Sequence, residues 1–288
     1  MNQSIPPCPR RLRRFAVLVV AMLVSLAAFA GAARAANYVA LGDSYAAGPV
    51  IPNQIAPLGC LKSDHNYAHL AAPTIGLPLR DASCSGATTA DMTNPQETEL
   101  GTNPPQFDSL DAETTRVSLT IGGNDIGFSE IIESCVTLNP FSTPCKDKYD
   151  SGGHDQIAER IAATAPKVAA VLQGIHSRSP NAEVFVVNYA DILPETGFGC
   201  WPQMPLGFGD VPYLRAKEKE LNAMLATQAA ANGASVVNWY NASLGHDACK
   251  SATTRWVEPL VPTNPAAPVH PNLAGMTGAA AILGPVAK

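Results

Sequence analysis

The sequence predicts an α/β fold, namely a three-layer α/β/α sandwich around a parallel sheet of about five strands. Two observations support this prediction. Short apolar runs alternate along the chain with longer stretches of helical periodicity, which is typical of a parallel sheet that helices cover on both faces. No internal repeat and no linker separates two cores between residues 36 and 288, so we expect one large domain there.

Five runs are short and apolar enough to form buried strands. They are residues 37–40, 79–83, 116–121, 183–188 and 234–238. The last three are the clearest, because each holds several consecutive or alternating large apolar residues. Their spacing leaves room for a helix in most of the intervals, as parallel connections require.

Four stretches between and after these runs predict helices. Residues 155–178 place apolar side chains on one helical face, and we expect Pro166 to kink that helix or split it in two. Residues 211–232 have Asp210 as a candidate N-cap and Asn232-Gly233 as a C-terminal stop. A last helix is expected over about 273–283, and a weaker one over 63–75.

Residues 1–35 carry the three-part pattern of a secretory signal peptide. A cluster of arginines from Arg10 to Arg14 is followed by the apolar stretch 15–30 and by Ala33-Arg34-Ala35, a suitable cleavage site. The apolar stretch is about 16 residues long, shorter than the roughly 20 that a spanning helix needs. We therefore favour a leader over a membrane anchor and expect the mature chain to start at Ala36.

The charge of the remaining chain and the lack of another long apolar segment limit the kinds of molecule that it could bind. Without the leader, 14 basic and 24 acidic side chains remain, a net charge of about −10. An acidic balance argues against nucleic acid as a partner, and no other segment is apolar enough to span a membrane. We expect a secreted monomer.

Six cysteines remain after the leader, which removes Cys8. An even number in an exported chain indicates disulfides. Fifteen connectivities are possible, and we favour pairing of neighbours in sequence order: Cys60–Cys84, Cys135–Cys145 and Cys200–Cys249. Metal binding is the alternative, but the chain has no C-x-x-C pair at ligand spacing, so we predict no metal site. We also expect no organic cofactor.

Four separated segments each supply one part that an ester-cleaving serine site needs. Ser44 follows the first strand, Ser85-Gly86-Ala87 the second and Gly122-Gly123-Asn124-Asp125 the third, while His270 precedes the last helix. The carboxyl ends of parallel strands meet at one edge of a sheet. A hydroxyl needs a base to take its proton, and a tetrahedral oxyanion needs hydrogen-bond donors. Ser44 could instead merely cap a helix.

These four blocks, in this order, resemble the SGNH (GDSL) hydrolases, and the resemblance covers nearly all of the chain after the leader. The six cysteines and the leader are most similar to secreted actinobacterial lipases and esterases within that family. The resemblance implies a flavodoxin-like core and catalysis by Ser44 with His270 as general base. It also implies an oxyanion hole made by the N–H groups of Ser44 and Gly86 and the side-chain amide of Asn124.

The third member of the triad departs from the family pattern. Most members carry an Asp three residues before the histidine, where this chain has Ala267. Something must still accept the imidazole Nδ1–H. We expect a backbone carbonyl, with Ala267 as its source. An acid from elsewhere, such as Asp247 or Glu258, is the alternative.

The sequence thus predicts hydrolysis of carboxylic esters, with a lipid or other acyl ester as substrate. Two alternatives stay open. One is a carbohydrate or polymer deacetylase or esterase that uses the same site. The other is a binding protein that has kept the fold without catalysis.

Overall fold

A computed structural model of the chain describes residues 1–4 and 35–288. The expected signal peptide lies almost entirely outside the described residues. Residues 36–288 form one unit. Among the described residues, no helix combines the length and the apolar character needed to cross a membrane.

The centre of this unit is a parallel sheet of five strands: β1 (Asn37–Gly42), β4 (Leu79–Asp81), β7 (Thr114–Thr120), β10 (Glu183–Val187) and β11 (Ser235–Val237). Their order across the sheet is β4-β1-β7-β10-β11. In chain order this is the 2-1-3-4-5 arrangement of flavodoxin-like sheets, whose ligand sites lie at the carboxyl ends of the strands. The predicted fold class is therefore confirmed, and so are all five predicted strand positions to within a few residues.

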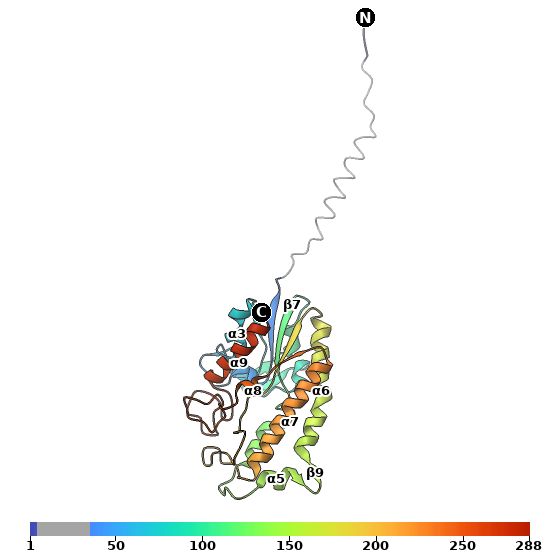
Figure 1. Ribbon diagram of the computed structural model, residues 1–288. Helices are drawn as coiled ribbons and strands as arrows, with labels where there is room; N and C mark the ends of the chain where they lie inside the picture. The colour runs from blue at the N-terminus through green and yellow to red at the C-terminus, as the bar shows by residue number, and fades with distance from the viewer. Residues whose placement is uncertain (5–34) are drawn as a thin grey trace. The chain divides into compact units, whose positions relative to one another are not determined.

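Helices cover both faces of the sheet, as expected for strands that are buried on both sides. Helices α3 (Tyr67–Ile75) and α9 (Leu273–Val286) pack together on one side. Helices α6 (Gln156–Arg178) and α7 (Asp210–Ala231) pack together on the other (Figure 1). Strand residues such as Val39, Val117 and Val186 are almost completely buried between the two layers.

Two helix predictions need correction. Helix α6 continues through Pro166 without splitting. Buried side chains on both sides of it, such as Ile161 and Val168, hold the two halves against the core, so packing outweighs the lost hydrogen bond. Helix α7 has Gly209 rather than Asp210 as its N-cap. The Asp210 carboxylate instead accepts hydrogen bonds from the N–H groups of Cys145 and Lys146, both 3.0 Å away.

The sequence did not predict the shorter elements. They are α2 (Ser44–Ala47), α4 (Phe128–Cys135), α5 (Pro144–Tyr149), α8 (Trp239–Ala242), the 3₁₀ turns η1 (Leu58–Cys60), η2 (Thr89–Met92) and η3 (Gln106–Ser109), and the hairpin strands β2 (Gln54–Ile55), β3 (Lys62–Ser63), β5 (Gln96–Thr98), β6 (Gly101–Asn103), β8 (Asp150–Ser151) and β9 (His154–Asp155). Most are too short for a periodic pattern to reveal.

Three disulfides join Cys60 to Cys84, Cys135 to Cys145, and Cys200 to Cys249. This confirms the predicted pairing of sequence neighbours. The first bond ties η1 to the loop after β4, and the second ties the end of α4 to the start of α5. All three lie outside the central sheet and restrain loops on the side of the molecule where its strands end.

Candidate active site

Ser44 is the first residue of α2, directly after the end of β1. Gly42 makes this sharp junction possible, because its φ is +146° and a Cβ there would lie 2.4 Å from the Thr120 carbonyl oxygen. Asp43 is the N-cap, and its carboxylate accepts the N–H of Tyr45 at 2.9 Å. Ser44 itself therefore does not cap the helix, and its hydroxyl is free to meet another group.

That group is His270. The Ser44 Oγ lies 2.8 Å from the His270 Nε2. The other ring nitrogen, Nδ1, lies 2.7 Å from the carbonyl oxygen of Pro268. A carbonyl can only accept a hydrogen bond, so Nδ1 carries the proton and Nε2 is the free base that faces the serine.

The expectation that Ala267 supplies the orienting carbonyl is wrong by one residue. The Ala267 oxygen accepts the backbone N–H of His270 at 3.2 Å. The Ala267 carbonyl is therefore already hydrogen-bonded within the turn, and the carbonyl of the next residue, Pro268, faces the imidazole ring. A backbone carbonyl leaves no mark in the sequence, so the spacing of the family's aspartate was the only guide.

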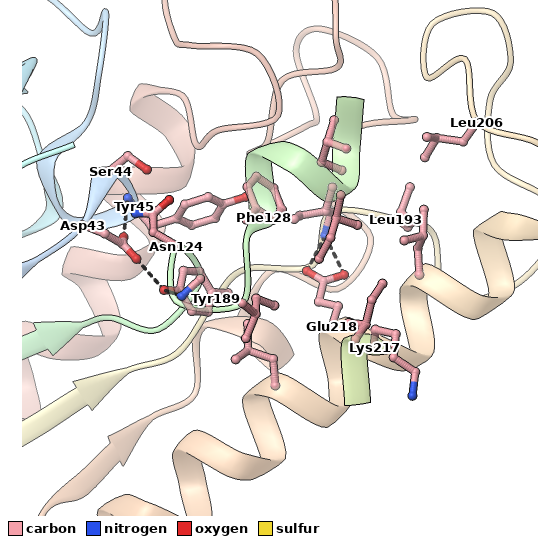
Figure 2. A pocket seen from close by; sticks show the side chains of 18 of the residues that line it. Asp43, Ser44, Tyr45, Asn124, Phe128, Tyr189, Leu193, Leu206, Lys217 and Glu218 are labelled. Atoms are coloured by element: carbon pink, nitrogen blue, oxygen red, sulfur yellow. Dashed lines mark hydrogen bonds between the residues drawn. The ribbon is translucent and has the colours of Figure 1, made fainter. Parts of the chain in front are cut away.

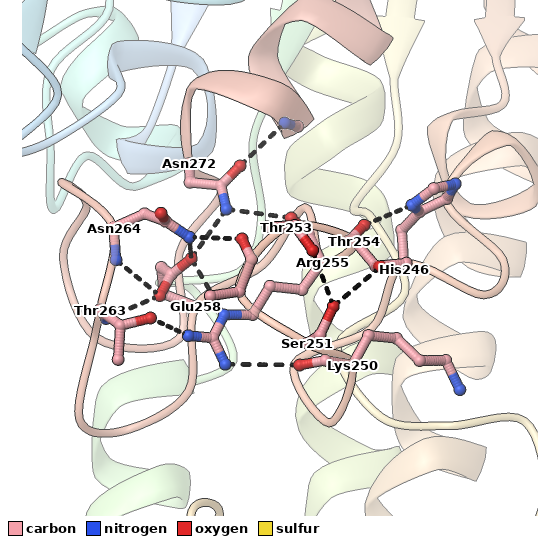
Figure 3. A network of polar contacts seen from close by, with 12 residues as sticks. His246, Lys250, Ser251, Thr253, Thr254, Arg255, Glu258, Thr263, Asn264 and Asn272 are labelled. Carbon is pink, nitrogen blue, oxygen red and sulfur yellow. Dashed lines mark hydrogen bonds and ion pairs between the residues drawn. The ribbon is translucent and has the colours of Figure 1, made fainter.

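Neither of the two alternative acids contacts the imidazole. Asp247 accepts the N–H of Cys249 at 2.9 Å and pairs with Lys250. Glu258 is completely buried and forms the centre of a polar network (Figure 3). Its carboxylate accepts hydrogen bonds from side chains or N–H groups of Arg255, Thr263, Asn264 and Asn272.

The Glu258 network supports the histidine loop from behind. Asn272, the N-cap of α9, donates to Glu258 at 2.7 Å. The Glu258 N–H donates to the His270 carbonyl oxygen at 3.0 Å. Burial would raise the pKa of Glu258, but the hydrogen bonds from Asn264, Asn272 and the Thr263 N–H outweigh it and lower the pKa to about 2. Glu258 thus holds the chain at His270 and just after it, at Asn272.

Val269 marks strain in this turn. Its φ is +60°, a left-handed conformation that costs a β-branched residue of the order of 1–3 kcal/mol. The hydroxyl of Tyr45 donates to the Val269 carbonyl at 2.8 Å. Because Tyr45 follows Ser44 directly, this bond ties the histidine turn to the serine turn.

Aromatic rings enclose the imidazole. The ring centres of Tyr45 and Phe128 lie 5.2 Å and 6.4 Å from that of His270. Burial by these neighbours lowers the pKa of His270 below its ordinary value of 6.5, against a smaller opposing effect of the Pro268 carbonyl. The imidazole therefore stays neutral, and able to accept a proton, to a lower pH than an exposed histidine.

Three groups that the sequence analysis expects in an oxyanion hole each carry a hydrogen-bond donor. Asn124 lines the same pocket as Ser44, and its amide is fixed by one bond from Nδ2 to the Ala87 carbonyl at 2.9 Å. Gly86 has a φ of +83°, which favours glycine. Within the described part of the chain, the N–H groups of Ser44 and Gly86 donate to no protein acceptor. Such donors can stabilise negative charge on an oxygen.

Tyr189, which no sequence pattern singled out, joins the serine turn to the loop after β7. Its hydroxyl accepts the N–H of Gly123 at 2.7 Å and donates to the Asp43 carboxylate. Burial raises the pKa of Asp43 to about 7, although the bonds from Tyr189 and Tyr45 oppose this shift. A lone tyrosine after the fourth strand belongs to no motif, and only the assembled sheet edge shows its position.

The comparisons with known proteins agree with this geometry. A family model described as the GDSL-like lipase/acylhydrolase family matches residues 40–277. The chain belongs to this family. This hydrolase is 42% identical to "Lipase 2" of Streptomyces coelicolor over 83% of its own length and 81% of that protein. It is 30% identical to a lipase of Streptomyces rimosus over 84% and 87% of the two chains.

Solved structures agree as well. The hydrolase is similar to the crystal structure of phospholipase A1 from Streptomyces albidoflavus NA297, with a TM-score of 0.72, 26% identity, and coverage of 88% of this chain and 99% of that one. It is also similar to an extracellular lipase from Streptomyces rimosus, with a TM-score of 0.68, 26% identity, and coverage of 87% and 99%. Together with the family match, these likenesses identify the hydrolase as an enzyme that cleaves carboxylic esters.

An apolar pocket leads away from Ser44 and Asn124 (Figure 2). Its walls come from α4, α6, α7 and the loop after β10, with side chains that include Phe128, Ile131, Ile157, Leu193, Leu206 and Leu221. Glu218 also lines it and accepts the Ile192 N–H at 3.1 Å. Burial, with a contribution from Asp191, raises the pKa of Glu218 well above its ordinary value, which favours the uncharged form of this wall residue.

Proposed function

We propose that this esterase is a secreted hydrolase of lipid-type acyl esters that works through an acyl-enzyme on Ser44. The observation that supports the mechanism is the chain of two hydrogen bonds from Ser44 through His270 to the Pro268 carbonyl, at 2.8 Å and 2.7 Å. It holds a neutral imidazole in the tautomer that can take the serine proton.

The steps follow from these contacts. The His270 Nε2 takes the Ser44 proton as the serine oxygen bonds to the ester carbonyl carbon. The former carbonyl oxygen becomes an oxyanion, which the N–H groups of Ser44 and Gly86 and the amide of Asn124 stabilise. The carbon–oxygen bond to the alcohol then breaks, and His270 gives the leaving oxygen its proton. Water repeats the sequence and releases the acid and free Ser44.

The Pro268 carbonyl takes the place of a triad carboxylate. It fixes the tautomer and the ring orientation, as an acid would. It carries only a partial negative charge, so it stabilises the imidazolium less than a carboxylate and leaves the histidine pKa low. Glu258 and Tyr45 hold the turn rigidly. The imidazole is therefore kept in position although the carbonyl attracts it less strongly than a carboxylate would.

The substrate proposal rests on the pocket beside Ser44. Aliphatic and aromatic side chains line most of it, and burial favours the uncharged form of its wall residue Glu218, so it suits an alkyl chain. This favours lipid-type esters over the deacetylase alternative. The free Ser44–His270 pair likewise disfavours a protein that only binds.

The test is a panel of nitrophenyl esters of rising acyl length, assayed with the wild type, Ser44→Ala and Asn124→Ala. We expect Ser44→Ala to lower kcat by at least about 10⁴-fold and Asn124→Ala by about 10²–10³-fold. Activity should extend well beyond acetyl esters. Full activity of Ser44→Ala would refute the mechanism, and activity confined to acetyl esters would favour the deacetylase.

Secretion is proposed on the signal-peptide pattern of residues 1–35 and on the three disulfides, which form in oxidising compartments. Expression of the full chain should deliver protein to the medium, and its N-terminal sequence should begin at Ala36. Retention of an intact N-terminus in the cell fraction would contradict this.

A further inference from the structure

Two surface segments beside the pocket contain no charged residue. They are residues 136–143, between α4 and α5, and residues 196–209, which lead into α7. We call them together the uncharged tip. Both adjoin disulfides, Cys135–Cys145 for the first and Cys200–Cys249 for the second.

The two segments are joined to one another. Val136 and Leu206 form an antiparallel bridge. The N–H of Phe208 donates to the Pro140 carbonyl at 2.7 Å. The ring centres of Phe141 and Phe208 lie 5.5 Å apart, edge to face. The uncharged tip is therefore one bonded surface rather than two independent loops.

Large apolar side chains of the uncharged tip point to solvent. Leu138 is 91% exposed, Phe141 83% and Phe198 64%. Val136 and Trp201 are exposed to a lesser degree. A gathering of such side chains is unusual on a protein surface and indicates an interaction site.

The same segments face the pocket on their inner side. Met204 and Leu206 of the second segment line it, and so does Ile131 of α4, the helix that leads into the first segment. Figure 2 shows Leu206 at the opposite end of the pocket from Ser44. The exposed apolar surface is thus the outer face of the wall that would hold the acyl chain.

We propose that the uncharged tip docks this enzyme onto a lipid surface whose headgroups are zwitterionic or uncharged. The inference rests on the proposed lipid-ester substrate, which would be presented in such a surface. Phe, Leu and Trp side chains insert at the boundary of headgroups and acyl chains without an ionic partner. Anionic lipid is a poor partner for the tip, because the tip has no Lys or Arg and the chain without its leader has a net charge of about −10.

The test measures partition of the protein onto phosphatidylcholine vesicles by co-sedimentation. Ser44→Ala protein is used so that the vesicles stay intact. In that background, Leu138→Ser/Phe141→Ser/Phe198→Ser should lower the partition coefficient by at least about tenfold, since binding scales with the apolar area inserted. Binding of the parent should change little up to about 0.5 M NaCl, because no ion pair contributes.

A matched control replaces three exposed apolar side chains outside the tip, Leu58→Ser/Leu100→Ser/Val286→Ser, which are 57%, 70% and 56% exposed. It should bind vesicles like the parent. With Ser44 present, both triple variants should hydrolyse a water-soluble nitrophenyl ester at the wild-type rate, which shows that they fold.

Three results would overturn the inference. The tip variant could bind as well as the control. Binding could require anionic lipid and disappear in salt. The tip variant could instead abolish a dimer seen by light scattering and leave vesicle binding unchanged, which would make a second copy the occupant. Failure of the proposed function is separate, because it would appear as no hydrolysis of the soluble ester by the wild type.

Discussion

Asp43 and Glu258 are both carboxyl groups with almost no exposure to solvent, 1% and 0% respectively. Asp43 supports the serine side of the site and Glu258 the histidine side. Their surroundings differ in the number of donors. Asp43 accepts bonds from the Tyr45 N–H and the Tyr189 hydroxyl, whereas the Glu258 network includes a guanidinium, two amides and two N–H groups.

The difference shows that burial alone does not decide the charge of a carboxyl group. Desolvation raises the pKa of both groups, but only Glu258 receives enough hydrogen bonds to reverse it. Asp43 has a pKa of about 7 and Glu258 one of about 2. The serine side is thus held by a group poised between neutral and charged, and the histidine side by a fixed anion.

The largest expected effect is on the pH dependence of stability in Asp43→Asn. The folded pKa of Asp43 is raised from 3.8 to about 7, so between these values the folded state holds a proton that the unfolded state has lost. Wild-type stability therefore falls as pH rises through this window, by about 4 kcal/mol, and Asn removes that fall.

Chemical denaturation of both proteins from pH 4 to pH 8 measures this. The stability difference between wild type and Asp43→Asn should shift in favour of the variant as pH rises. A stability difference that stays constant from pH 4 to pH 8 would mean that Asp43 is ionised throughout, like Glu258. The two carboxyl groups would then not differ in charge as we propose.

For Glu258→Gln, the stability difference from the wild type should change with pH in the opposite direction. The pKa of Glu258 is lowered from 4.5 to about 2 in the folded protein. The ionised carboxylate therefore stabilises the fold fully above pH 4.5, and this stabilisation is lost as the pH falls toward 2. At pH 7 we expect a loss of about 3 kcal/mol, because Gln presents an N–H₂ to groups that donate.

The measurement is the free energy of unfolding of wild type and Glu258→Gln between pH 3 and pH 7. The difference should shrink as pH falls. Equal stability of the two proteins at pH 7 would show that the network is not a fixed anion site. Activity of the folded variant should fall less than tenfold, since Glu258 does not touch the imidazole.

Tyr189→Phe tests the link between the serine turn and the loop that carries Asn124. The change removes the hydroxyl that bridges the Gly123 N–H and Asp43. We expect a stability loss of about 1–2 kcal/mol and a loss in kcat of roughly tenfold, because a shift of Gly123 moves the neighbouring amide.

A merely structural role would lower stability alone. The informative readout is therefore kcat against KM for a short ester. We expect kcat to fall while KM stays nearly constant, because in the proposed mechanism the Asn124 amide stabilises the oxyanion and not the bound substrate. A KM increase with unchanged kcat would contradict the positioning role.

The parts of the site that the sequence predicted are those that follow strands. Ser44, Gly86 and Asn124 come directly or closely after β1, β4 and β7, and parallel strands bring such positions to one edge. His270 was identified with them through a family motif. The disulfides were predictable for a different reason, since each joins two cysteines that follow one another in sequence order and lie outside the sheet.

The parts that the sequence missed have no local signature. The Pro268 carbonyl is a backbone atom whose role depends on the left-handed turn at Val269. Tyr189 is a lone aromatic residue that acts across 66 and 146 residues of chain. Such partners become visible only when the tertiary structure brings them together.

The smallest effect is expected for Asp247→Asn. Asp247 was an alternative partner for the imidazole, but its carboxylate accepts the Cys249 N–H and pairs with Lys250. Asn can still accept the N–H. Because the Pro268 carbonyl orients His270 and burial lowers the pKa of the ring, the variant should keep kcat within about twofold. The acidic limb of its kcat/KM profile should coincide with that of the wild type, below pH 6.5. A fall near 10⁴-fold, as loss of a triad carboxylate causes, would return the orienting role to an acid.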